Sequence, residues 1–248
     1  MNLDRMFQAG VAVAIVGVVW AVWPQSNAVY SSASRIHHST YRHGPAVLVD
    51  RGHWNRPGAD PRLDGLMQLL AFDGYQVSRN RQEFVPELFR GTWVLVVADA
   101  MGWKGALLPQ GLHAHPEAFS PEEVAAVSDW VNRGGALLLI ADRPPAGEAS
   151  QRMASAFGTR LMDTPAGPER FDVAGPMGED VTYAMSFGGS KVTGPPGSVA
   201  FLQSQGVAFE FGRGRVVVLT AQLAGAGGRR PDNRQLMLNI MHWLTRTD

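Results

Sequence analysis

Short, continuous runs of apolar residues recur along the chain from residue 45 onward, and three of them end at or beside an aspartate. Apolar runs of this length that do not alternate with polar residues are typical of strands buried on both faces of a parallel sheet. We therefore predict strands at 46–49, 75–78, 93–97 and 136–140.

The segments between these runs carry helical signals. Apolar positions within 61–72 have helical spacing, and Asp60 is a candidate N-cap for that helix. A shorter helix is expected at 85–89. The sequence SPEE at 120–123 is a capping box that begins an amphipathic helix, and the glycine pair at 134–135 ends it.

The second half of the chain has a different pattern. Residues 159–197 are rich in glycine and proline and give only weak strand signals. Farther on, apolar runs at 207–211 and 215–219 flank the turn sequence GRG, which predicts a hairpin. Asp232 and Gln235 have the spacing of a second capping box before a final amphipathic helix.

The order of these elements indicates the fold class. Strands that alternate with helices predict an α/β fold in which helices cover both faces of a parallel sheet. Because the hairpin adds an antiparallel strand, we expect the sheet to be partly mixed.

A hydrophobic segment precedes this domain. Every residue from Ala9 to Trp23 is apolar or glycine. A helix that begins at Met6 and ends at Trp23 would be about 27 Å long, close to the hydrocarbon thickness of a bilayer. We expect residues 1–24 to be a transmembrane anchor or, alternatively, a signal segment cleaved after Ala28.

This interpretation divides the chain into three parts. Residues 25–44 form a flexible linker rich in serine and histidine, and residues 45–248 form the folded domain. The domain is then held at the membrane by the N-terminal helix, outside the cytoplasm, or is secreted or periplasmic after cleavage.

Composition excludes two classes of function. Lys and Arg together number 22, as do Asp and Glu, so the formal net charge is zero. Nucleic-acid binding is not expected, because neutralising phosphates requires a surplus of basic residues on one face. The chain has no cysteine, which excludes disulfides, thiolate metal sites and a cysteine nucleophile.

Polar residues that follow the predicted strands are the candidate binding residues. Ligands of open parallel sheets bind beyond the carboxyl ends of the strands. Asp50, Asp99 and Asp142 lie at such ends, and three further residues belong to neighbouring loops or to the start of the last helix: His53, Asn55 and Asn233. The aspartates could bind a divalent cation, accept hydrogen bonds from sugar hydroxyls, or cap helices and loop amides.

Several segments together resemble an uncharacterised bacterial domain family in the class I glutamine amidotransferase-like superfamily. They are VLVDRGHWN, TWVLVVADAMG, FSPEEVAAVSDWVNRGGALLLIADRPPAG and GVAFEFGRGRVVVLTAQLAG. The resemblance covers residues 45–248 and implies a flavodoxin-like fold. Family members tend to carry an acidic residue and an alanine where this chain has Arg51 and Gly52, and a histidine where it has Arg143.

The resemblance also bears on activity. Amidotransferases of the superfamily place a cysteine on a sharp turn after a strand, and Asp142-Arg143 occupies the corresponding strand end here. An aspartate cannot act as a thiolate nucleophile, so glutamine amidotransferase activity is excluded. Arg143 therefore joins the candidate ligand-binding residues.

Three functions remain open. The first is a non-catalytic ligand-binding or scaffolding domain at the membrane, which recognises a small polar ligand or a protein partner. The second is a hydrolase or carbohydrate-processing enzyme that uses the strand-end carboxylates. The third is an accessory subunit of a transport complex. No cofactor is implied, apart from the divalent cation already considered.

Overall fold

The computed structural model describes residues 44–55, 59–102, 117–142, 144–223 and 231–246. Their main feature is a seven-stranded sheet with the strand order β2-β1-β3-β4-β11-β10-β9. In that order the strands are β2 (Gln76–Asn80), β1 (Ala46–Asp50), β3 (Val94–Ala98), β4 (Ala136–Ile140), β11 (Gly214–Leu219), β10 (Gly206–Phe211) and β9 (Val199–Phe201).

The sheet is mostly parallel. The five strands from β2 to β11 run in the same direction, whereas β10 and β9 pair antiparallel at one edge. The predicted α/β class and the partly mixed sheet are thus confirmed. The order of the parallel strands, with the chain reversing its direction of winding between β1 and β3, is consistent with a flavodoxin-like fold.

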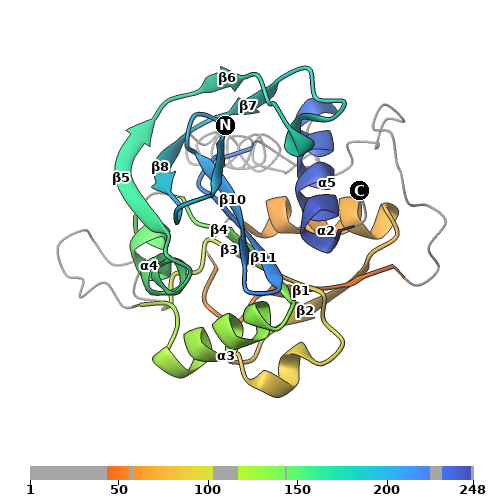
Figure 1. The fold of residues 1–248 in the computed structure, drawn as a ribbon, viewed down its shortest axis with the longest axis vertical. Coiled ribbons are helices and arrows are strands. Elements are labelled where there is room, and N and C mark those ends of the chain that lie inside the picture. Colours follow the sequence, from red (N-terminus) through yellow and green to blue (C-terminus); the bar gives the residue numbers. More distant parts are fainter. Residues whose placement is uncertain (1–43, 56–58, 103–116, 143, 224–230, 247–248) are drawn as a thin grey trace, which may run out of the picture.

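Helices cover both faces of this sheet (Figure 1). Helices α2 (Ala59–Phe72) and α5 (Pro231–Thr245) pack on one face, and η1 (Pro86–Phe89), α3 (Pro121–Asn132) and α4 (Ala146–Ala156) pack on the other. Successive side chains of β3 enter the two cores alternately, because neighbouring residues of a strand point to opposite faces. This two-sided burial explains why the strand sequences are continuously apolar.

Helix α3 begins as the sequence predicts. The Ser120 hydroxyl accepts a hydrogen bond from the Glu123 amide, and the Glu123 carboxylate accepts one from the Ser120 amide at 2.9 Å. The helix ends before Gly134, whose φ of +120° is a conformation that glycine adopts without strain.

Other boundaries differ from the prediction. Helix α2 begins at Ala59, so Asp60 lies inside the helix rather than at its N-cap. Helix α5 begins at Pro231, and Asp232 lies in its first turn. The Asp232 carboxylate accepts the Tyr183 amide at 3.2 Å, so the predicted second capping box is wrong and this side chain joins α5 to a neighbouring strand.

The glycine- and proline-rich segment is more ordered than its sequence suggests. It forms two antiparallel pairs, in which β5 (Arg160–Ala166) pairs with β8 (Gly189–Thr193), and β6 (Glu169–Phe171) pairs with β7 (Ala184–Ser186). A short helix, η3 (Pro176–Gly178), packs on α5. Helix α4, which precedes β5, was not predicted either.

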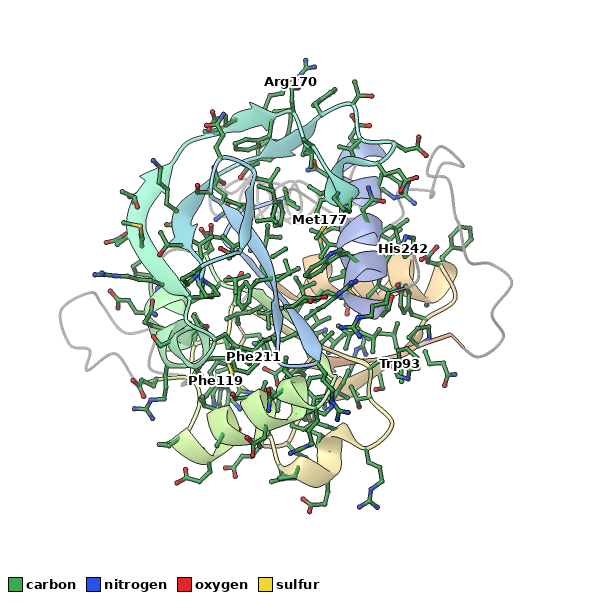
Figure 2. The ribbon with its side chains drawn as sticks, viewed as in Figure 1. Trp93, Phe119, Arg170, Met177, Phe211 and His242 are labelled. Carbon is green, nitrogen blue, oxygen red and sulfur yellow. The ribbon has the colours of Figure 1, made fainter. Side chains whose placement is uncertain are left out.

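A buried hydrogen bond between side chains joins the two helices on the first face. His242 of α5, labelled in Figure 2, places Nε2 2.7 Å from Asp73 Oδ2, just after the end of α2. Both side chains are buried, so this contact fixes the position of α5 against α2 from inside the domain.

In the part of the chain that the structure describes, no helix has the length and apolarity needed to cross a bilayer. The predicted anchor or signal segment at 1–24, and the linker as far as residue 43, lie outside the described residues.

Candidate functional site

The strand-end residues form two separate groups. Asp50 and His53 belong to a buried network around the start of α3, whereas Asp99 and Asp142 lie together at the ends of β3 and β4. The parallel sheet therefore gathers the aspartates at one end, as predicted, and the second group lines a cavity.

The first group is an imidazole held between two carboxylates. His53 Nδ1 lies 2.9 Å from Asp50 Oδ1, and His53 Nε2 lies 2.7 Å from Glu123 Oε1. The ring also packs between Phe84 and Phe119, with centroid distances of 4.5 and 4.7 Å. Only 7% of His53 is exposed, so its contacts are all with the protein.

The charge state of this network follows from its contacts. Burial tends to lower the pKa of His53, but the hydrogen bonds and charges of Asp50 and Glu123 outweigh it and raise this pKa to about 9. Burial likewise opposes ionisation of Glu123, yet His53 and the amides of Ser120 and Phe84 lower the Glu123 pKa to about 2. At neutral pH, His53 is therefore an imidazolium that donates both N–H groups.

These contacts let the first group hold α3 and two loops together. Glu123 Oε1 also accepts the Phe84 amide at 2.9 Å, so one carboxylate joins the start of α3 to the loops after β1 and β2. Since both ring nitrogens of His53 are occupied and the ring is covered, the structure does not present His53 to a ligand.

The second group lies at the carboxyl ends of β3, β4 and β11. Asp99 has a φ of +47°, and its Oδ1 lies 3.4 Å from the Asp142 amide. The Gln222 side chain, which follows β11, donates to Asp142 Oδ2. Asn55 lies on the adjacent loop and donates to the Ala98 carbonyl at 2.5 Å.

A cavity of about 610 Å³, which we call the polar cavity, opens beside Asp142. It lies between β4, α4 and the β5–β8 pair. Besides Asp142, its polar lining consists of Glu148, Gln151, Ser155, Arg160, Asp163, Ser190 and Thr220. The Ser190 hydroxyl is buried and has no hydrogen-bond partner among the described residues. A small hollow adjoins Asp142 as well, and apolar residues of α2, of α5 and of the ends of β3, β4 and β11 make up most of its lining.

Sequence reasoning found Asp142 but missed the rest of this lining. Most of the lining residues belong to α4 and β5, elements that the sequence pattern did not reveal. Their polar residues carry no motif, so only the fold brings them to one cavity.

Two predicted residues lie elsewhere. The Asn233 side chain accepts the Met185 amide and donates to the Met185 carbonyl, both at 2.8 Å, so the structure uses it to hold strand β7 against α5. Arg143 is outside the described residues. Among the described residues, no three His, Asp or Glu side chains are grouped in a way that could hold a metal ion.

Comparisons with known proteins agree with this fold. No protein-family model matches the sequence, and no curated protein matches it. Among solved structures, the N-terminal domain of mmIFT52 is similar over 81% of this chain and 97% of its own, with a TM-score of 0.63 and 13% identity.

Two bacterial structures are similar in the same way. The cytoplasmic protein STM3548 from Salmonella typhimurium matches 81% of this chain and 99% of its own, with a TM-score of 0.59 and 13% identity. A ThuA-like protein from Bacteroides uniformis matches 86% and 95%, with a TM-score of 0.52 and 9% identity. These TM-scores show a shared α/β fold, and at such low identities the likeness extends to the fold alone.

Proposed function

We propose that this domain binds a small polyhydroxylated ligand, such as a sugar, in the polar cavity, and that it is a non-catalytic member of the uncharacterised family that its sequence resembles. The observation that carries the proposal is the mixed lining of the cavity. Carboxylates, hydroxyls and a guanidinium line it together, at the carboxyl end of a parallel strand.

The chemistry of this lining suits a polyol better than a simple ion. Each hydroxyl of a sugar donates one hydrogen bond and accepts others, so a binding site needs both acceptors and donors. Asp142 and Asp163 supply acceptors, while Arg160 and the buried Ser190 hydroxyl supply donors. Leu161 and Met162 give an apolar wall for the ring carbons.

Binding is tested by calorimetric titration of the full chain with glucose, galactose and mannose, in a detergent without a sugar headgroup. Asp163→Asn and Arg160→Gln replace exposed residues of the cavity and should leave the fold intact. Loss of a hydrogen bond to a charged group should weaken binding roughly tenfold or more. Glu83→Gln, an exposed carboxylate on a distant loop, is the matched control.

Absence of binding for all three sugars, or equal affinity of the cavity variants and the control, would overturn the proposal. A second candidate function, glycoside hydrolysis, is favoured by one observation: Asp142, Glu148 and Asp163 line the same cavity. Incubation with nitrophenyl glycosides separates the two, because a binding module gives no release of nitrophenol.

The location of the domain also remains a proposal. The apolar segment 9–23 supports a membrane-anchored protein with its domain outside the cytoplasm, where it could serve as an accessory subunit of a transport complex. Fractionation of cells that express the tagged chain, with protease protection of the domain, tests this arrangement.

A further inference from the structure

A second cavity lies at the opposite end of the sheet from the polar cavity. It encloses about 350 Å³ where β3, β4 and β11 begin and where α3 and α5 end. Its side-chain lining is basic and aromatic, and we call it the arginine pocket: Trp93, Trp130, Arg133, Arg215 and Arg246, with Thr92, Leu244 and Thr245.

We propose that the arginine pocket binds a phosphate-bearing group. No described residue that lines it carries a carboxylate, although the chain as a whole has no net charge. Three guanidinium groups therefore share one hollow. Guanidinium groups suit phosphate because their planar N–H donors match its oxygens in pairs.

Arg215 is held in place as part of the pocket wall. Its guanidinium carbon lies 4.7 Å from the ring centroid of Trp243, and its Nη1 donates to the Trp243 carbonyl at 2.5 Å. Its Nε lies 3.5 Å from Glu210 Oε1 but forms no hydrogen bond with any described residue. These contacts hold the Arg215 charge in place at the pocket, so it needs no rearrangement when an anion binds.

Arg133 and Arg246 supply the other two positive charges of the arginine pocket. Among the described residues, the side chain of Arg133 has no partner, and it is exposed at the end of α3. Arg246 donates to the Arg213 carbonyl at 2.9 Å and lies 3.9 Å from Glu210.

Among the described residues, the local balance of charge is positive. Glu210 contributes one negative charge, but it is largely exposed and lies outside the lining. Each of the two helix ends contributes roughly half a negative charge. Together these offset part of the three guanidinium charges and leave an excess for an anion.

The rim of the pocket is apolar and accessible. Trp93, labelled in Figure 2, is 56% exposed just before β3, and its amide donates to the Ala46 carbonyl at 2.9 Å. The first strand, β1, thus begins beside this tryptophan. Either an anionic lipid headgroup or free phosphate supplies the required group, and an exposed indole next to arginines suits the headgroup.

The test uses the full chain in a non-ionic detergent. Equilibrium dialysis measures uptake of radiolabelled inorganic phosphate, and fluorescence titration measures binding to mixed micelles that contain phosphatidylglycerol or, as a phosphate-free reference lipid, diacylglycerol. The double variant Arg133→Gln/Arg246→Gln removes two exposed charges and spares the packed Arg215. Arg81→Gln, an exposed arginine near the opposite end of the sheet, is the matched control.

We expect the wild type to bind at least one of the two phosphate sources, and the double variant to bind it at least tenfold more weakly, while the control variant binds normally. Saturation by inorganic phosphate alone would identify a free phosphate as the ligand. Binding only to phosphatidylglycerol micelles would identify a headgroup. Binding to neither, equal binding to both lipids, or equal affinity of the double variant and the control would overturn the proposal.

Discussion

The imidazolium held between Asp50 and Glu123 should make the stability of the domain depend on alkaline pH. The pKa of His53 is raised from 6.5 to about 9, so the folded state binds this proton more tightly than the unfolded state does. The stabilisation that comes from the protonated His53 is fully present below pH 6.5 and is lost as the pH rises through 9. A shift of this size corresponds to about 3 kcal/mol at roughly 1.4 kcal/mol per unit.

His53→Gln isolates this contribution, because glutamine has a similar length and a donor but cannot take up a proton. Urea unfolding of both proteins, followed by circular dichroism, gives their difference in unfolding free energy at pH 6, 7.5 and 9. Titrating groups that do not interact with His53 cancel in that difference. We expect the variant to be less stable at pH 6, because Asp50 and Glu123 then lack a cation, and the gap to shrink by about 3 kcal/mol by pH 9.

A gap that stays constant with pH would refute this reasoning, since it would mean that His53 has the same pKa in the folded and the unfolded protein. A gap that widens toward pH 9 would refute it as well. Nuclear magnetic resonance of the ring gives an independent value, because the His53 signals should titrate near pH 9 rather than near the 6.5 of a free histidine side chain.

Two further substitutions test contacts that position the elements. Gly135→Ala should destabilise the domain by about 1 to 3 kcal/mol in urea unfolding, because the new Cβ would lie 2.2 Å from the Trp130 ring. Gly167→Ala is the control: its new Cβ meets no atom within 4 Å, so its unfolding free energy should not change. Asn233→Ala should cost about 1 to 3 kcal/mol and speed hydrogen exchange of the Met185 amide, because the amide and the carbonyl of Met185 each lose a hydrogen bond to Asn233; unchanged exchange would contradict that role.

The parallel sheet could be predicted because its strands are short, apolar without interruption and separated by helical segments. The start of α3 could be predicted because a capping box is a local arrangement of four residues. Helix α4 could not, because its buried face is made largely of small residues, among them Ala146, Gly147 and Ala149. The segment therefore has few large apolar residues to indicate a buried helix, and its small residues let the helix pack closely.

The candidate site was predicted only in part. The convergence of Asp99 and Asp142 follows from adjacent parallel strands, whose ends must meet at one edge. Glu123 lies 70 positions from His53, and the sequence explained it fully as the last residue of a capping box. Glu123 also contacts the buried imidazolium of His53. That contact depends on how α3 packs against the loop after β1, and no local sequence pattern indicates such packing.

The register of β4 against β11 has a consequence for how the domain can work as a whole. The two strands are in register from Ala136–Arg215 to Ile140–Leu219, so each runs from the arginine pocket to the polar cavity. At roughly 3.3 Å per residue, this span sets the two openings about 15 to 20 Å apart, facing opposite ways. A domain that binds a membrane through the arginine pocket would thus hold the opening of the polar cavity away from that membrane.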